Sequence, residues 1–505
     1  MSSNLNIILD LDIVLDLLSL STNDTQHRFS RLQKTVTRFW LPCCLLPLVE
    51  TQLNHRRPLK SLLEDIHLLS TLAAHWHEIP DDCPNKTHAL ISLDAAILPG
   101  VAIIWTNDPD FHSVNPDIEC GDHEFVYGKL AEFECENEIL FNELSTQQLD
   151  LRAELEKNLF TVLKHQQYTH GNEINAIENQ LANYVGSKHC ITVNNGTNAL
   201  LLALIALGVK TDDEIITSPY AFIATAEMIR LLGAKPVFVD IDPNTYTLNP
   251  KLIENAITPK TKAIIPVNLY GQCADFDAIN LIATERHLAV IEDASQSFGS
   301  TYKNRYSCSL ATVGCTSFSA IKPLGTYGNG GACFTDDTVL AETIRELRTH
   351  GQNYRYYHHI TGTNSQLDSF QASVLLAKFT KFPQELIARQ NVANTYTHLL
   401  KEKLMGKVKT PVIMQYNTSS YNYYAIEIEN RDDIQQKLQK RDIPTEIHYP
   451  LPIHLQLAFA FLKQGEGTFN VAESVSRRIL CLPIHAYLGE ETVKEIVTAL
   501  VRVLQ

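Results

Sequence analysis

No part of this 505-residue sequence is apolar for long enough to cross a lipid bilayer. The longest apolar run is Ala199–Leu207, whereas a membrane-spanning helix needs about 20 such residues. The start of the chain has no basic stretch ahead of an apolar one. Asp10, Asp12 and Asp16 interrupt its only early apolar segment, which argues against a secretory signal peptide. We therefore expect a soluble cytoplasmic protein without a membrane partner.

Paired cysteine motifs and an excess of positive charge are also missing. The 11 cysteines occur singly or as the neighbours Cys43 and Cys44, and there is no CxxC motif. The sequence therefore carries no zinc or dithiol signature, and we predict buried, reduced thiols and no metal site. The net charge of -15 disfavours nucleic acid as a partner, because phosphate binding needs a basic surface.

What the sequence does contain is a repeated alternation of strand-like and helix-like segments, which predicts a mainly parallel sheet covered by helices. The length exceeds that of a single hydrophobic core. We predict an α/β domain over 1–115, an acidic connector over 116–140, a large domain over 141–380 and a smaller domain over 381–505. Strands are expected at Asn6–Asp10, Ala102–Trp105, Glu214–Thr217, Pro236–Asp240, Lys262–Val267, Ala289–Glu292 and Thr316–Ser319. Helices are expected at Ile13–Leu20, Ala199–Leu207, Asp275–Glu285 and Thr338–Arg348.

Polar residues follow the predicted strands, where an open parallel sheet binds its ligands. The turn Asn194–Asn198 leads directly into the helix Ala199–Leu207, and the free N–H groups of such a helix start attract anions. Asp293 comes directly after the strand Ala289–Glu292. Each feature taken alone also fits an ordinary helix cap.

Lys322 lies between the strand Thr316–Ser319 and the glycine-rich turn Gly328–Gly331. Burial there would lower its pKa and ease imine formation, and Ser317 is close enough in sequence to reach a phosphate. Alone, the lysine also fits a solvated loop. Together, however, a lysine, a carboxylate that can pair with a pyridine nitrogen, and an anion-binding helix start are the groups that pyridoxal phosphate requires.

Several longer motifs carry a resemblance to a known family. They are Gly171–Ile174, Asn195–Thr197, Ala221–Ala226, Pro266–Gln272, Ile291–Gln296, Ser317–Gly331, His350–Gln352, Asn364–Asp368, His448–Pro450 and Leu482–His485. From about residue 141 to the end, the chain resembles the sugar aminotransferases of the DegT/DnrJ/StrS family. The resemblance implies a type I fold for pyridoxal-phosphate-dependent aminotransferases, with a mostly parallel sheet between helices and a small C-terminal lobe.

The resemblance also implies a role for each matching position near the cofactor. Lys322 would carry the cofactor and move the proton between substrate and cofactor. Asp293 would pair with the pyridine nitrogen, Gln296 would contact the side of the ring hydroxyl, and Phe222 would stack on the ring. The phosphate would be held by Gly196, Thr197, Asn198 and Ser317.

Other matching positions concern the substrate and a second subunit. Asn364 would reach the phosphate site of a neighbouring subunit, which implies a homodimer with shared active sites. His448 and Tyr449 would lie near the sugar. Gln366 departs from the family, which often has Arg at this position, and a neutral amide replaces neither the charge nor the fork geometry of a guanidinium.

Tyr306–Leu310 and Gly314–Phe318 look most like the enzymes that aminate UDP-2-acetamido-2-deoxy-3-oxo-glucuronate. The expected reaction is therefore transamination of a nucleotide-linked keto-sugar, with glutamate as the amino donor, in the synthesis of cell-surface polysaccharide or glycan precursors. Two alternatives stay open at this point. One is a ribonuclease with a non-catalytic C-terminal half, and the other is a non-catalytic sugar-binding regulator.

Residues 1–115 fall outside this family and faintly resemble a PIN-like nuclease domain. Asp10, Glu50 and Asp108 stand where such a domain has carboxylates for Mg²⁺ or Mn²⁺. The remaining expected acid falls near His88, which leaves the site incomplete. These acids also fit solvated or capping positions. We therefore expect a degenerate domain used for association or regulation rather than an active ribonuclease.

Overall fold

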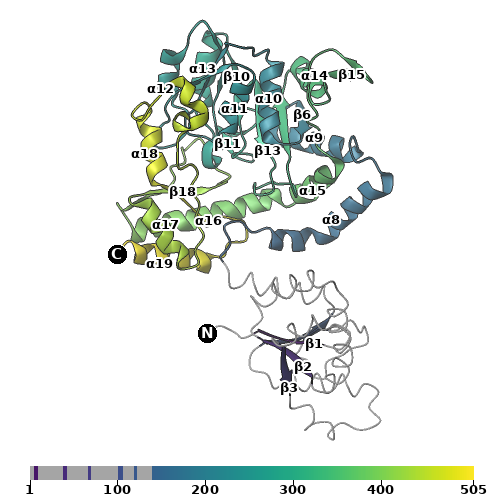
Figure 1. Ribbon diagram of the computed structural model, residues 1–505, viewed down its shortest axis with the longest axis vertical. Coiled ribbons are helices and arrows are strands. Elements are labelled where there is room, and N and C mark those ends of the chain that lie inside the picture. Colours follow the sequence, from purple (N-terminus) through teal and green to yellow (C-terminus); the bar gives the residue numbers. More distant parts are fainter. Residues whose placement is uncertain (1–4, 10–37, 43–65, 70–100, 106–118, 122–138) are drawn as a thin grey trace. The chain divides into compact units, whose positions relative to one another are not determined.

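A computed structural model describes residues 5–9, 38–42, 66–69, 101–105, 119–121 and 139–505. The chain divides into two compact units, Met1–Glu138 and Ile139–Gln505. Figure 1 shows the second unit as a sheet enclosed by helices.

The first unit contains a five-stranded parallel sheet. Its strands are β1 (Leu5–Leu9), β2 (Arg38–Pro42), β3 (Ile66–Leu69), β4 (Val101–Trp105) and β5 (Glu119–Gly121). Their order, β3-β2-β1-β4-β5, is that of a doubly wound α/β sheet. The strands predicted near Asn6 and Ala102 are confirmed as β1 and β4. The following predictions lie outside the described residues: the helix Ile13–Leu20 and the side chains of Asp10, Glu50, His88 and Asp108.

The acidic connector predicted over 116–140 is wrong at Glu119–Gly121. These residues form β5, which pairs in parallel with β4 at the edge of the sheet. An edge strand has a neighbour on one side only, so charged residues are tolerated there. A run of acids therefore does not distinguish a connector from an edge strand, and the first unit extends to Glu138.

The second unit is built on a seven-stranded sheet. Its strands are β6 (His189–Val193), β7 (Glu214–Thr217), β8 (Lys235–Phe238), β9 (Thr261–Ile265), β10 (Ala289–Asp293), β13 (Val313–Ser317) and β14 (Gly331–Thr335). Their order is β6-β14-β13-β10-β9-β7-β8, and only β14 runs antiparallel to its neighbours. The predicted strands of this sheet are confirmed, although β13 begins and ends earlier than predicted. β6 and β14 were not predicted.

Helices cover both faces of this sheet, because successive strand residues present apolar side chains to opposite faces. One face carries α10 (Gly196–Ala206), α11 (Ala224–Leu231) and α14 (Thr338–Leu347). The other carries α9 (Asn172–Val185), α13 (Phe276–Glu285) and α15 (Ser369–Phe379), with α8 (Ser145–His165) packed on α15. In β7, for example, Ile215 faces the first group and Ile216 the second. The helices predicted in this unit are confirmed as α10, α13 and α14.

After α15 the chain forms a smaller lobe. It contains α16 (Phe382–Lys403), α17 (Arg431–Gln439), α18 (Asn470–Arg478), α19 (Glu490–Val503), β17 (Val408–Lys409), β18 (Tyr424–Ile428) and β19 (Ile479–Leu482). The long helix α16 runs toward α17 and α19 (Figure 1), and apolar residues of all three share one core with β18 and β19. Among the residues that the structure describes, no helix is both long and apolar enough to span a membrane.

Glu292 in β10 is a fully buried carboxylate with four hydrogen-bond donors. Its Oε1 accepts from Asn268 Nδ2 at 2.8 Å, Ser307 Oγ at 2.7 Å and the Cys308 N–H at 2.8 Å. Its Oε2 accepts from the Leu310 N–H at 3.1 Å. Burial raises the pKa of Glu292, and these hydrogen bonds oppose the shift. The side chain therefore holds two loops against the strand.

We predict that Glu292→Ala lowers the free energy of unfolding of the second unit by about 3 kcal/mol, because four buried donors lose their acceptor. Glu292→Gln keeps one acceptor oxygen and should cost less. All 3 tryptophans precede residue 139, whereas Tyr127 is the only tyrosine that does. Urea unfolding followed by the near-ultraviolet circular dichroism of tyrosine therefore reports on the second unit. Equal stability of Glu292→Ala and wild type would contradict this role.

Candidate active site

The ends of the parallel strands define the candidate site. β6, β7, β9, β10 and β13 point the same way, so their carboxyl ends meet at one edge of the sheet. A cavity of about 400 Å³ lies at that edge. Its lining includes Gly196, Thr197, Phe222, Thr225, Val267, Asp293, Gln296, Ser317, Ser319, Lys322, Asn329, Tyr423, His448 and Tyr449.

One part of the cavity is formed by a helix start. α10 begins directly after β6, and the Asn195 side chain accepts the Asn198 N–H at 2.7 Å. The N–H groups of Gly196 and Thr197 have no partner within the helix, and both residues line the cavity. A Cβ on Gly196 would come within 2.7 Å of the Ser317 Cβ, so only glycine fits this close approach. Free N–H groups beside a serine hydroxyl make a cradle for a phosphate.

Asp293 places a fixed carboxylate in the same cavity. It ends β10 and is 5% exposed. Its Oδ2 accepts from Thr225 Oγ1 at 2.7 Å, and its Oδ1 accepts from the Ser295 N–H at 3.2 Å. A carboxylate held at both oxygens keeps one position, which suits it to bind a protonated ring nitrogen.

Lys322 supplies a free amine. It lies in the loop between β13 and β14, and its Nζ is 6.0 Å from the centroid of the Tyr423 ring. No hydrogen bond or ion pair to another described residue holds this Nζ. Burial lowers the pKa of Lys322 to about 8, and the Asp293 carboxylate opposes part of that shift. A larger fraction of this amine than of an exposed lysine is therefore neutral and nucleophilic near neutral pH.

The C-terminal lobe contributes His448 and Tyr449. The Tyr449 hydroxyl accepts from Gln296 Nε2 at 3.0 Å, and Gln296 Oε1 accepts the Tyr270 N–H at 2.8 Å. His448 Nε2 lies 2.7 Å from Glu446 Oε2. Burial lowers the pKa of His448, and Glu446 opposes the shift. Gln296 is thus held from two directions, with its amide between the large domain and the lobe.

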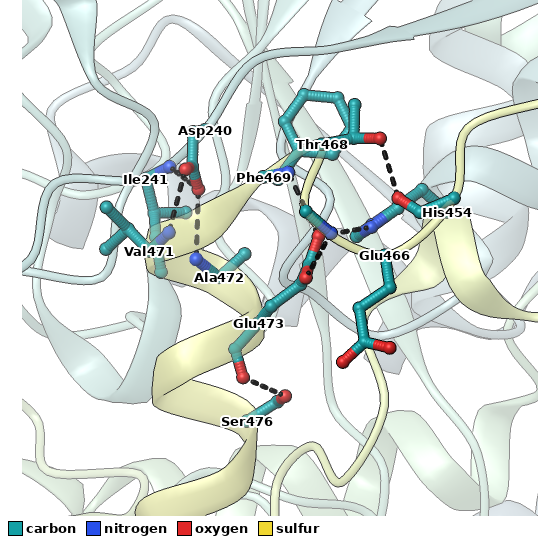
Figure 2. A network of polar contacts seen from close by, with 12 residues as sticks. Asp240, Ile241, His454, Glu466, Thr468, Phe469, Val471, Ala472, Glu473 and Ser476 are labelled. Atoms are coloured by element: carbon teal, nitrogen blue, oxygen red, sulfur yellow. Dashed lines mark hydrogen bonds and ion pairs between the residues drawn. The ribbon is translucent and has the colours of Figure 1, made fainter.

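The chain after Tyr449 is anchored by a buried network, which Figure 2 shows from close by. His454 Nε2 lies 3.1 Å from Glu473 Oε1, which also accepts the Phe469 N–H at 3.0 Å. Asp240, two residues after β8, accepts two N–H groups at the start of α18, at 2.9 and 3.0 Å. Burial lowers the pKa of His454, and Glu473 opposes the shift. These contacts join the His448–Tyr449 segment to α18 and, through α18, to the large sheet.

The cavity brings together most of the predicted site residues. Those that line it are Gly196, Thr197, Phe222, Asp293, Gln296, Ser317, Lys322, His448 and Tyr449. Asn198 does not line it, because its Nδ2 donates to Asn194 Oδ1 at 2.8 Å. Asn364 is exposed and also lies outside the cavity. Gln366 lines a neighbouring hollow of about 290 Å³.

Thr225, Asn329 and Tyr423 are among the lining residues that sequence reasoning missed. Thr225 lies inside the motif Ala221–Ala226, and its contact with Asp293 follows from the common edge of β7 and β10. Asn329 lies in the glycine-rich turn after Lys322, so that motif carried a signal for it. Tyr423 precedes β18 in a stretch without a motif, and nothing in the local sequence distinguishes it from a core tyrosine.

These groups fit pyridoxal phosphate: a phosphate cradle, a fixed carboxylate, a free lysine and an exposed aromatic ring, Phe222, which is 56% accessible. Residues 149–501 match the model of the DegT/DnrJ/EryC1/StrS aminotransferase family. The chain belongs to this family. The protein is a pyridoxal-phosphate-dependent aminotransferase of type I fold, which confirms the predicted enzyme class, cofactor and fold. The alternatives of a nuclease with a non-catalytic C-terminal half and of a sugar-binding regulator find no support.

Individual relatives match the aminotransferase over at least 70% of its chain. The UDP-2-acetamido-2-deoxy-3-oxo-D-glucuronate aminotransferase of Pseudomonas aeruginosa is 48% identical over 362 residues, 72% of this chain and 99% of that protein. The UDP-N-acetyl-3-dehydro-alpha-D-glucosamine 3-aminotransferase of Acidithiobacillus ferrooxidans is 37% identical over 355 residues, 70% of this chain and 95% of that protein. NtdA from Bacillus subtilis, whose crystal structure has bound cofactor PMP, is 30% identical in sequence. Its structure matches with a TM-score of 0.66, over 70% of this chain and 82% of that chain.

The lowered pKa of Lys322 predicts how the aminotransferase without cofactor captures pyridoxal phosphate. Only the neutral amine attacks the aldehyde, so the rate of capture should rise with pH and level off above about 8. The rate is measured from the visible absorbance that appears on mixing, at a series of pH values. Lys322→Ala should show no such absorbance at any pH. An inflection near 10.5, the value of an unperturbed lysine, would contradict the burial of this amine.

Proposed function

We propose that this aminotransferase aminates a UDP-linked 3-oxo sugar, with glutamate as the amino donor, to make a precursor of a cell-surface polysaccharide or glycan. The carrying observation is the 48% identity that spans 99% of the Pseudomonas aeruginosa enzyme, whose name gives such a substrate. The Acidithiobacillus ferrooxidans relative is also named for amination at position 3 of a UDP-linked sugar. Agreement between these two relatives supports the position of the keto group as well as the nucleotide.

The residues of the cavity divide this reaction among them. When bound, pyridoxal phosphate withdraws electrons from the carbon that carries the amine. Asp293 would bind the protonated ring nitrogen, while the N–H groups of Gly196 and Thr197 would bind the phosphate. In the first half-reaction, Lys322 Nζ would take a proton from the α carbon of the donor and pass it to the aldehyde carbon of the cofactor. In the second half-reaction, it would take a proton from that cofactor carbon and deliver it to the sugar carbon that receives the amine.

Two successive absorbance measurements test this function. Glutamate should convert the visible band of the purified protein to a near-ultraviolet band, and a UDP-linked 3-oxo sugar should then restore the visible band. Lys322→Ala should complete neither conversion, because it lacks the group that moves the proton. Restoration by pyruvate or oxaloacetate but not by the UDP-sugar would overturn the proposed substrate class while leaving the aminotransferase intact.

We further propose a homodimer in which Asn364 is supplied to the active site of the partner. The resemblance to the family supports this assignment, as does the exposure of Asn364 outside its own cavity. The chain just before it forms the hairpin β15 (Gln352–Tyr354) and β16 (Tyr357–His358). Tyr354, Tyr356 and Tyr357 of this hairpin are 74%, 76% and 71% exposed, and tyrosine is enriched at protein interfaces.

A mixing experiment tests the shared site. Lys322→Ala and Asn364→Ala should each be inactive or strongly impaired. Mixed under conditions of subunit exchange, they should regain about one quarter of the wild-type activity, because half of the dimers are hybrids with one intact site each. The measurement is product formation by the separate and the mixed variants. No recovery, in a mixture that mass spectrometry shows to contain hybrid dimers, would contradict the sharing.

We also propose that the enzyme works in the cytoplasm and that its first unit serves association or regulation. The cysteines of the described chain support the first point, since Cys190, Cys273, Cys308, Cys315, Cys333 and Cys481 are all unpaired. The incomplete set of acids in the sequence of the first unit supports the second, because metal-dependent nuclease chemistry needs several converging carboxylates.

A further inference from the structure

Two tyrosine hydroxyls hold the peptide group between His448 and Tyr449. The Tyr449 N–H donates to the Tyr220 hydroxyl at 3.1 Å, and that hydroxyl donates to the His448 carbonyl oxygen at 3.2 Å. The Tyr270 hydroxyl donates to the same carbonyl oxygen and lies 3.1 Å from the Tyr220 hydroxyl. The contacts to this peptide group are made to its backbone N–H and carbonyl oxygen, so they leave the His448 and Tyr449 side chains free to face the cavity.

The two tyrosines belong to the large domain, whereas the peptide they hold belongs to the C-terminal lobe. Tyr220 lies between β7 and α11, two residues before Phe222, and Tyr270 lies in η4 (Leu269–Gly271) after β9. The Ile453 N–H donates to the Pro219 carbonyl oxygen at 2.7 Å, so the loop after β7 holds the segment at a second point. The position of the lobe residues beside Phe222 is therefore set by hydrogen bonds rather than by apolar packing alone.

Burial keeps both hydroxyls protonated. Tyr220 is 1% exposed and Tyr270 is 7% exposed, and burial raises the pKa of each well above its usual value. Both therefore remain hydrogen-bond donors throughout the pH range of the enzyme. Tyr270 also donates its backbone N–H to Gln296, whose amide meets the Tyr449 hydroxyl, so one residue orients both partners of that contact.

We propose that Tyr220 and Tyr270 are positioning residues for the keto-sugar, acting through His448 and Tyr449. The inference rests on the proposed function, because it names the sugar as the ligand of these two side chains. The two hydroxyls make no hydrogen bond to the groups assigned to the cofactor, at the start of α10, at Asp293 and at Gln296, and Tyr270 contacts Gln296 through its backbone N–H. Loss of the Tyr220 hydroxyl should therefore weaken sugar binding and leave cofactor and donor largely unaffected.

Tyr220→Phe removes the hydroxyl and keeps the ring. We expect the KM for the UDP-linked 3-oxo sugar to rise about tenfold, while the glutamate half-reaction stays within about twofold of wild type and the cofactor absorbance is unchanged. Tyr424→Phe is the matched control. Tyr424 is fully buried, and its hydroxyl lies 2.8 Å from Thr397 Oγ1 in the core of the lobe. The control should alter neither half-reaction.

A double variant separates positioning from general support. If Tyr220 acts through Tyr449, its substitution should matter less once the Tyr449 hydroxyl is gone. The factor by which Tyr220→Phe raises the sugar KM should therefore be smaller in the Tyr449→Phe background than in the wild type. An unchanged KM in Tyr220→Phe overturns the proposal. An equal loss in both half-reactions also overturns it, because that pattern indicates a structural role.

Hydrogen exchange tests the hydrogen bonds without any sugar. The Tyr449 amide of the holoenzyme should exchange about tenfold faster in Tyr220→Phe, because its acceptor is gone. If the Tyr449 amide exchanges at the same rate in Tyr220→Phe and in the wild type, Tyr220 does not hold this peptide group, and the proposal is overturned whatever the substrate is. If the wild-type enzyme aminates no nucleotide-linked keto-sugar, the proposed function fails, and faster exchange then supports the hold while the role toward the sugar is overturned.

Discussion

The parallel direction of neighbouring strands is the constraint on which the rest of this enzyme depends. Because six of the seven strands of the large sheet end at one edge, residues far apart in the sequence meet there: Gly196 after β6, Asp293 at the end of β10 and Ser317 at the end of β13. The same edge presents the start of α10, whose unpaired N–H groups need an anion or water. The site therefore depends first on the common direction of the strands, which brings these residues together at one edge of the sheet.

This arrangement has an energetic cost, because it leaves an amine and a carboxylate in a desolvated cavity. Asp293 is compensated by Thr225 and the Ser295 N–H, whereas Lys322 has no such partner among the described residues. The pKa of Lys322 is lowered because burial disfavours its charged form and the Asp293 carboxylate offsets only part of that effect. Just before Asp293, the carboxylate of Glu292 is fully satisfied by four donors. Adjacent residues of one strand thus serve opposite purposes, one facing the cavity and the other securing the loops.

Much of the fold was predictable, because strands buried on both faces are continuous apolar runs that stand out in a sequence. β7 and β10 were placed within one residue for this reason. β13 was placed too late because its first residues, Val313–Cys315, include glycine and cysteine and lack the expected apolar pattern. The sequence does not predict β14, because its glycine-rich start is typical of a turn.

The cofactor side of the site was more predictable than the substrate side. Lys322, Asp293 and Gly196 belong to short motifs with strong chemical requirements. The hydroxyls of Tyr220 and Tyr270 act on a peptide more than 170 residues away in the chain, at separations of 228 and 178 residues from His448. Local sequence carries no information about such a pairing. The side chain of Asn198 shows the opposite error, since its place in a motif did not reveal that it turns to Asn194.

The single reversed strand has a consequence for how this enzyme can diversify. Because β14 runs against β13, the chain leaves the sheet at Ser317 and re-enters it at Gly331 on the same side. Lys322 therefore lies in a loop whose two ends, Ser317 and Gly331, are paired next to each other in the sheet. A change in the length of that loop would move the reactive nitrogen within the cavity, while the pairing of β13 with β14 stays intact.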